Sequence, residues 1–125
     1  MDAQEALAEL ATLSSQIEDA AILGGSGSVL ASTGTPERGE QLAQVAAELL
    51  AAAADVRASG EVSRVEVKLG STSVFVVVEG GRTAVATTVR EPTAGLVLYD
   101  LRTALRRLDE LDPERPKPKK KAADA

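Results

Sequence analysis

Two very short connections, Gly70-Ser71 and Gly80-Gly81, separate three strand-like segments in the second half of the chain. The segments are residues 62–69, 72–79 and 82–89, and in the first of them apolar residues alternate with charged ones. Alternation with a period of two is typical of a strand whose two faces have different surroundings. A two-residue connection can join only antiparallel neighbours, and glycine supplies the positive φ angles that such turns need. These residues therefore predict a three-stranded antiparallel meander.

A hairpin is predicted nearer the N-terminus, where two short apolar runs, residues 20–23 and 29–32, bracket the turn Gly24-Gly25-Ser26-Gly27-Ser28. The turn is glycine-rich, but a phosphate-binding loop also needs Lys and Ser or Thr at its end and a helix directly after it. Here a strand-like run follows, and Leu30 stands where a dinucleotide-binding loop has its third glycine. The pattern favours a hairpin turn.

Amphipathic helices are predicted at both ends of the chain. Residues 3–15 have apolar positions three and four apart, with Asp2 as N-cap and Glu5 in the capping-box position. After Pro92, Thr93 is placed to cap a last helix that ends before Pro113. The apolar positions of that last helix are Leu98, Leu101, Leu105 and Leu108.

The longest predicted helix, residues 36–59, has Thr35 as N-cap, Pro36 at its first position and Gly60 beyond its end. One apolar stripe has the spacing of a core face: Leu42, Val45, Leu49, Ala52 and Val56. A second lies roughly 100° further round the axis: Ala43, Ala46, Ala47, Leu50 and Ala54. Because one sheet covers only one stripe, we expect the second to pack against another copy of the chain.

A polar stripe remains beside the two apolar ones on the same helix. Its members are Glu37, Gln41, Gln44 and Glu48. We expect these side chains to contact a partner protein.

The chain has no His and no Cys, which removes the imidazole base, thiol nucleophiles and the commonest metal ligands. Carboxylate pairs such as Glu18 with Asp19, or Glu79 with Glu91, are not brought together by the sequence alone. Lys68 is the only lysine before residue 117, so a lysine base for a Ser or Thr nucleophile is also disfavoured. We therefore expect no enzymatic activity, no cofactor and no metal site.

Charge and composition divide the 125-residue chain into a predicted domain, residues 1–112, and a disordered Pro- and Lys-rich tail, residues 113–125. The tail holds five of the 14 basic and two of the 19 acidic residues, so it carries +3 and the domain −8. An electrostatic tether to an acidic partner is the alternative interpretation of the tail. The overall charge of −5 and the scarcity of aromatic residues disfavour nucleic-acid binding. With no signal peptide pattern and no membrane-spanning run, we expect a cytoplasmic protein.

The order helix, two strands, helix, three strands, helix resembles the roadblock/dynein light-chain family over about residues 5–111. Residues 17–32 and the segment Pro92-Thr93-Ala94-Gly95-Leu96-Val97-Leu98 carry the resemblance, although Ser26 stands where the family often has Asp, and Thr93-Ala94 where Asn is common. The resemblance implies an α+β fold, with a five-stranded antiparallel sheet, the long middle helix on one face and the terminal helices on the other. It also implies a homodimer through the middle helices and the third strand, here Val62, Val65 and Val67.

The function that this resemblance implies is a non-enzymatic, homodimeric regulator or scaffold, because prokaryotic members of the family commonly dock a small Ras-like GTPase. We expect the chain itself to bind no GTP, since it lacks a phosphate loop. Two alternatives stay open: a scaffold subunit without a GTPase partner, and a profilin-like or GAF-like ligand-sensing domain, which needs a roomy pocket.

Overall fold

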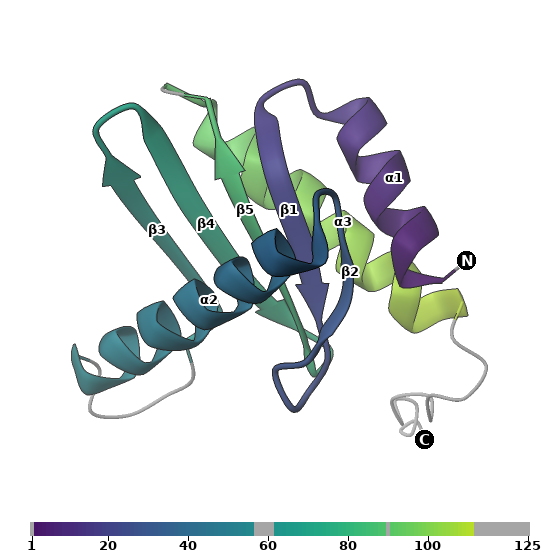
Figure 1. Cartoon of the computed structure of the whole chain (residues 1–125), viewed down its shortest axis with the longest axis horizontal. Helices are drawn as coiled ribbons and strands as arrows, with labels where there is room; N and C mark the ends of the chain where they lie inside the picture. The colour runs from purple at the N-terminus through teal and green to yellow at the C-terminus, as the bar shows by residue number, and fades with distance from the viewer. Residues whose placement is uncertain (1, 57–61, 90, 112–125) are drawn as a thin grey trace, which may run out of the picture.

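A computed structural model describes residues 2–56, 62–89 and 91–111 of the chain (Figure 1). The element order agrees with the one predicted from the sequence. The helices and strands are α1 (Ala3–Leu13), β1 (Ile17–Leu23), β2 (Val29–Ser32), α2 (Pro36–Val56), β3 (Arg64–Leu69), β4 (Thr72–Glu79), β5 (Arg82–Thr88) and α3 (Ala94–Leu111).

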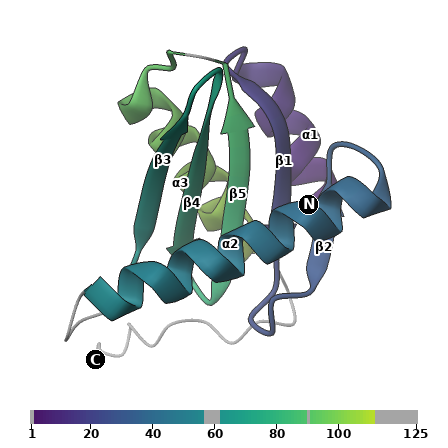
Figure 2. The ribbon, with the colours of Figure 1, turned by 60° about the vertical axis from the view of Figure 1, so that its left-hand side comes forward.

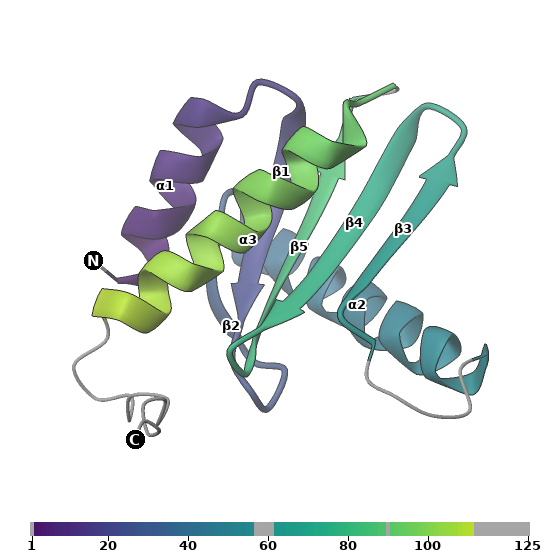
Figure 3. The ribbon, with the colours of Figure 1, turned by 180° about the vertical axis from the view of Figure 1, so that it is seen from behind.

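The five strands form one antiparallel sheet in the order β2-β1-β5-β4-β3. Helix α2 crosses one face of the sheet obliquely (Figure 2), and α1 and α3 lie together on the other face (Figure 3). This is the arrangement that the resemblance to the roadblock family implied. The chain connection from β2 to β3 through α2 runs from one edge of the sheet to the other.

Strand β1 begins three residues earlier than predicted, at Ile17 rather than Ala20. The sequence pattern did not predict this extension, because Glu18 and Asp19 interrupt the apolar run. Pairing with β5 stabilises it, since Ile17 is opposite Thr88, and the register shifts between Ile17 and Asp19 to accommodate the irregularity.

Tight turns connect the meander as expected. Gly80 and Gly81 have φ angles of 65° and 79°, and the strands on either side pair directly from Glu79 opposite Arg82. Two consecutive positive φ angles are the geometry of a type I′ hairpin turn, which side chains with a Cβ adopt only at a cost. The register of β4 and β5 is therefore set at this turn.

Each face of the sheet has its own hydrophobic core. Beneath α1 and α3, the fully buried side chains include Leu7, Ile22, Phe75, Leu101 and Leu105. Beneath α2, the core is smaller and consists of Ala21, Leu23, Leu42, Ala46, Val74, Val76 and Val85. One helix with mostly small side chains thus covers one face of the sheet, whereas two helices cover the other face.

The helix starts follow the sequence signals. Asp2 accepts a hydrogen bond from the Glu5 amide at 2.9 Å and the Glu5 carboxylate accepts one from the Asp2 amide at 3.0 Å, which is a capping box. Thr35 Oγ1 accepts a hydrogen bond from the Arg38 amide at 3.2 Å before the first turn of α2. The predicted end of the long helix, residues 57–59, and the predicted tail, residues 113–125, lie outside the described residues.

Candidate protein-interaction surface

The face of α2 that packs on the sheet lies between the two apolar stripes predicted from the sequence. Gly39, Leu42 and Ala46 are buried, and Leu49 and Leu50 are partly buried against the same core. The side of α2 that packs on the sheet therefore includes members of both predicted stripes. The two stripes are only about 100° apart on the helix, so a sheet centred between them takes the inner members of both.

Three members of the predicted dimer stripe face the chain's own sheet. Ala46 is fully buried, and Ala43 and Leu50 pack against the same core. The other two members, Ala47 and Ala54, are exposed. Ala46 consequently has no surface left for a second copy of the chain.

Members of the predicted core stripe are exposed instead. Val45 is at the margin of the buried face, Ala52 is exposed, and Val56 is 84% exposed. Val56 follows Leu49 by seven residues and so lies on the same side of the helix. It is exposed because the last turns of α2 extend past β3, where the sheet ends, as Figures 1 and 2 show.

The predicted polar stripe lies on the side of α2 opposite the sheet. All four of its side chains are exposed: Glu37, Gln41, Gln44 and Glu48. The amide of Gln44 donates to Glu48 Oε2 at 3.3 Å, and Gln41 Oε1 accepts a hydrogen bond from Arg38 at 3.2 Å. These contacts pair Arg38 with Gln41 and Gln44 with Glu48 on the polar side of the helix.

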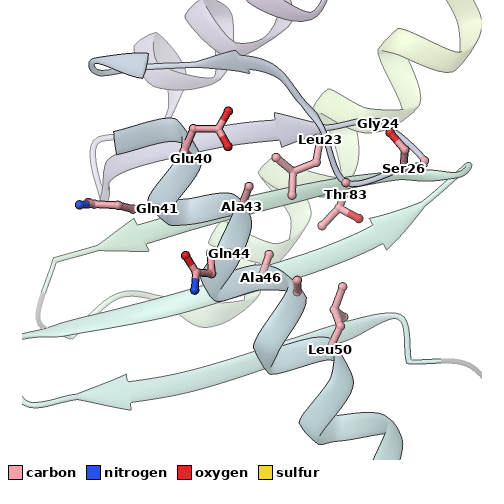
Figure 4. A pocket seen from close by; sticks show the side chains of 13 residues that line it. Leu23, Gly24, Ser26, Glu40, Gln41, Ala43, Gln44, Ala46, Leu50 and Thr83 are labelled. Carbon is pink, nitrogen blue, oxygen red and sulfur yellow. The ribbon is translucent and has the colours of Figure 1, made fainter. Parts of the chain in front are cut away.

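A groove of about 600 Å³ runs between α2 and the β1–β2 turn (Figure 4). Its lining residues include Glu40, Gln41 and Gln44 of α2 together with Leu23, Ala46 and Thr83. In Figure 4 the Gln41 side chain points away from Leu23 and Thr83. Small residues leave the space open: Ala43, Ala46 and Ala47 of α2 are among its lining residues, and the turn, residues 24–27, has three glycines. The groove joins two of the predicted partner residues to an apolar floor.

Sequence reasoning missed Glu40, Leu23 and Thr83 as members of this surface. They come from three elements, α2, β1 and β5, and only the folded sheet brings them together. The small residues at 43, 46 and 47 were the one available signal, and they were interpreted as a dimer contact.

Strand β3 forms one edge of the sheet in the part of the chain that the structure describes. Val65 and Val67 are half-buried and lie on the α2 side, because they pair with Val76 and Val74 of the α2 core. Val62 precedes the strand and is also half-buried. The outward edge of β3 presents backbone groups in the direction in which α2 extends.

Two of the four acidic residues considered for catalysis are bonded to arginines. Asp19 forms an ion pair with Arg38 at 3.2 Å, and Glu79 forms ion pairs with Arg102 and Arg106. Within the described ranges, no group of three or more potential metal ligands gathers at one point. Among those same residues, none of the helices is long and apolar enough to cross a membrane.

The β1–β2 turn is a hairpin turn rather than the start of a phosphate loop. Leu23 pairs with Val29 across it, and strand β2 follows directly. The amide of Gly27 donates to the Gly24 carbonyl within the turn, at 2.9 Å. A strand after the turn offers no helix N-terminus to an anion, so the structure excludes this segment as a P-loop.

The fold is similar to those of several solved structures. The chain superposes on a Roadblock/LC7 domain from Streptomyces avermitilis with a TM-score of 0.77 and 23% identity, covering 88% of this chain and 97% of that one. Myxococcus xanthus MglB is similar with a TM-score of 0.64 and 16% identity, over 87% of this chain and 83% of MglB. LokiProfilin2, solved in complex with rabbit actin, gives a TM-score of 0.60 and 15% identity, over 86% and 95% of the two chains.

No protein-family model matches the sequence, and no curated protein does. The likeness is thus one of three-dimensional structure. The order of helices and strands along the chain, the five-stranded antiparallel sheet and the side of the sheet that each helix covers all agree with the expectation, and the fold of this chain is the roadblock/LC7 fold.

Proposed function

We propose that this chain is a non-enzymatic regulator or scaffold that forms a homodimer and binds a small Ras-like GTPase on the outer surface of α2. The observation that carries the proposal is the state of α2 in the single chain. Its polar stripe, the groove beside it and its overhanging end are all uncovered.

The overhang of α2 supports the homodimer. Val56 is on the sheet-facing side of the helix but has no sheet beneath it, since β3 is the last strand. A second copy that pairs its β3 with this β3 extends the sheet under the overhang and buries Val56. Pairing also satisfies the backbone groups of an edge strand, which natural proteins rarely leave exposed. The interface in this proposal uses Val65, Val67 and the end of α2.

The groove and its rim support partner binding. Protein interfaces combine an apolar centre with a polar rim that makes hydrogen bonds. Leu23, Ala43 and Ala46 supply an apolar floor, and Gln41 and Gln44 stand at its edge. Because these residues are held by a regular helix and a hairpin, little conformational entropy is lost when a partner docks.

The choice of a Ras-like GTPase as partner follows from the resemblance to the roadblock family. The chain itself has no phosphate loop, so any nucleotide belongs to the partner. Arg38 is an unsuitable arginine finger because it is engaged by Asp19 and by Gln41. Regulation therefore acts through contact with the surface of the GTPase.

Titration calorimetry tests the proposal in two steps. GTP and a non-hydrolysable analogue are titrated first into the protein alone, and we expect no heat of binding. The protein is then titrated into Ras-like GTPases encoded beside its gene, each in the GDP form and in the analogue form. We expect binding in at least one nucleotide state.

Substitutions locate the binding surface. The double variant Gln44→Arg/Glu48→Arg replaces the exposed centre of the polar stripe and should weaken GTPase binding by about tenfold or more. Glu18→Arg, an exposed change on β1, is the matched control and should leave the affinity unchanged. If the double variant binds the GTPase with unchanged affinity, the polar stripe of α2 is not the binding surface.

Two results would favour the alternatives. A stable dimer that ignores every GTPase in both nucleotide states would indicate a scaffold subunit. A heat of binding on titration with a small molecule that occupies the groove would indicate a ligand-sensing domain. The groove, about 600 Å³ in volume, offers space for such a ligand.

A further inference from the structure

The groove between α2 and the β1–β2 turn has an apolar wall, and Glu40 is the one charged residue among the described residues that line it. Ala43 and Leu50 point from α2 toward Leu23 and Thr83 of the sheet (Figure 4). The volume of about 600 Å³ is typical of clefts that enclose a whole ligand. The groove therefore has room for more than one side chain of a partner.

Acidic side chains continue from Glu40 along the outer side of α2. Glu37 precedes Glu40 by three residues and Glu48 follows it by eight, so all three lie on one side of the helix. All three are exposed. Within the part of the chain that the structure describes, none of them forms an ion pair. The outer edge of the groove thus carries negative charge that a partner can neutralise.

Two arginines near the groove do not offset this charge. Arg38 of α2 is paired with Asp19 at 3.2 Å, so the pair has no net charge. Arg82 begins β5, and alternation along the strand puts it on the same face as Ala84, which belongs to the core under α3. Arg82 also has an interaction partner already.

The remaining charges beside α2 do not offset it either. Arg64 and Lys68 alternate along β3 with the valines that face α2, so they lie on the face under α3. Asp55, near the end of α2, is exposed and adds a further negative charge. Arg57 and Glu61, which follow α2 outside the described residues, carry opposite charges. The α2 side of the groove is consequently acidic.

An apolar wall with an acidic edge selects for one kind of ligand. A phosphate or a carboxylate would be repelled by the three glutamates of α2. Lysine and arginine have long apolar stems and cationic heads, so their stems can cover apolar surface while their heads reach carboxylates at its edge. A purely basic segment would leave part of the wall in contact with water, so an apolar side chain completes the match.

We propose that this groove is the docking site for a segment of a partner protein in which an apolar side chain is flanked by lysines or arginines. The apolar side chain packs on Ala43, Ala47 and Leu50, and the flanking cations pair with Glu37 and Glu40. The identity of the partner as a Ras-like GTPase rests on the proposed function, whereas the chemistry of the segment comes from the groove. The chain's own residues 113–125 are basic but contain no Val, Leu, Ile, Met or aromatic side chain, so they match only the edge.

Fluorescence anisotropy with a labelled pentapeptide, one leucine between two pairs of arginines, tests the groove on the full-length protein. We expect binding that weakens as salt rises, because salt screens the ion pairs. The same peptide with glycine in place of leucine should bind about threefold more weakly or worse, since it buries no side chain in the groove. Absence of binding, equal binding of the two peptides, or binding of a version with glutamates in place of the arginines would overturn the proposal.

Ala47→Arg puts a long cationic side chain into the groove itself and should weaken peptide binding by about tenfold or more. Ala8→Arg is the matched control, because Ala8 is an exposed alanine of α1, on the other face of the sheet, and the net charge changes equally. It should change the affinity by less than about twofold. Both alanines are exposed, so neither variant disturbs a core. Equal effects of the two variants would overturn the groove as the site.

Glu37→Gln/Glu40→Gln removes two carboxylates from the edge and should weaken peptide binding by about threefold or more. Glu18→Gln/Glu66→Gln is its control, with the same change in net charge. Glu18 is near the start of β1, whereas the groove lies at the end of that strand, and Glu66 is opposite Phe75 on the face under α3. The control should stay within about twofold of the unchanged protein. A loss as large as that of the first pair would show attraction to net charge alone and overturn the proposal.

Calorimetry with the GTPase separates this proposal from the proposed function. Ala47→Arg should weaken GTPase binding by about tenfold or more. GTPase binding that this variant leaves unchanged would overturn the groove as the docking site but not the function. Peptide binding with the expected variant effects, without binding of any GTPase, would support the groove and overturn the function.

A last full-length variant tests the chain's own basic residues as the occupant. Replacing Lys119, Lys120 and Lys121 by glutamine should change the peptide affinity by less than about threefold. A larger gain would show that residues 113–125 compete for the groove, and would overturn the choice of a partner segment.

Discussion

Gly39 of α2 lies so close to Ser32 of β2 that a Cβ atom at position 39 would stand 2.9 Å from both the Cβ and the Oγ of Ser32. Val29 of the same strand would be 3.5 Å away. Real Cβ contacts are essentially never as short as 2.9 Å, and the Ser32 Cβ is fixed to its backbone. The absence of a side chain at position 39 thus allows the start of α2 to pack directly on the edge strand.

Gly39→Ala should destabilise the protein. Alanine favours a helix over glycine by about 1 kcal/mol, but overpacking costs about 1–3 kcal/mol. We expect the steric term to win and the melting temperature to fall by about 4–8 °C for each kcal/mol lost. Thermal unfolding followed by circular dichroism measures the difference.

Gly95→Ala is the control for this prediction. Gly95 is also in the first turns of a helix, α3, but a Cβ there would meet nothing within 4 Å. The same substitution should therefore raise stability by about 0.4–1 kcal/mol. If both variants move the melting temperature in the same direction, the contact with Ser32 does not decide the result.

Two adjacent threonines at the end of β5 give a second prediction. Thr87 Oγ1 is buried without a hydrogen-bond partner among the described residues, whereas Thr88 Oγ1 lies 3.0 Å from the Val89 carbonyl oxygen. Thr87→Val removes an unpaired hydroxyl with little change in shape and should stabilise the fold by about 1 kcal/mol or more. Thr88→Val loses a hydrogen bond and should destabilise it by about 1 kcal/mol.

Urea unfolding of the two valine variants checks this pair. Both side chains are buried in the same strand, so local β propensity and volume change equally. Opposite signs of the change in unfolding free energy are expected. Equal effects would show that Thr87 has a partner, such as an ordered water, in solution.

The proposed boundary between domain and tail makes a third prediction. Residues 113–125 contain no Val, Leu, Ile, Met or aromatic side chain with which to dock. A chain ending at Asp112 should melt within about 1–2 °C of the full-length protein, which corresponds to a negligible free-energy change. A chain ending at Arg107 also loses Leu108, which is 4% exposed in the α3 core, and should be clearly less stable. A large fall already on removal of the tail would contradict the boundary.

The fold was predictable because its signals are local. Gly80-Gly81 sets a two-residue hairpin, Asp2 with Glu5 starts α1, and Thr35-Pro36 starts α2. Each of these depends on residues a few positions apart, whose geometry the chain itself fixes. Strand β1 was underestimated because its first residues are held by β5, which is distant in sequence.

The surfaces were harder to predict because they depend on the phase of α2 relative to the sheet. Val45 and Ala46 are adjacent and both apolar, yet Ala46 is fully buried and Val45 is not. Gly39 contributes to this orientation, since it lets α2 approach strand β2 with the side of the helix on which Gly39 lies. The ion pairs of Glu79 with Arg102 and Arg106 could not be predicted for a similar reason, because they join β4 to α3, which are distant in the sequence.

The corrected packing of α2 changes how the proposed homodimer must be tested. Leu50 packs on the core under α2, so Leu50→Glu puts a charge into the monomer core and should lower the melting temperature whatever the oligomeric state. Val56 is 84% exposed in the single chain, so Val56→Glu should leave the monomer fold intact, within about 0.5 kcal/mol. If a second copy covers Val56, the buried charge opposes association by several kcal/mol.

Light scattering coupled to size exclusion measures this effect. We expect twice the chain mass for the unchanged protein and the chain mass for Val56→Glu at the same micromolar concentration. Leu13→Glu is the matched control, because Leu13 is 73% exposed at the end of α1, on the other face of the sheet, and should leave the dimer intact. A monomeric unchanged protein, or a Val56→Glu variant that stays dimeric, would show that the sheet is not continued beneath the overhanging end of α2.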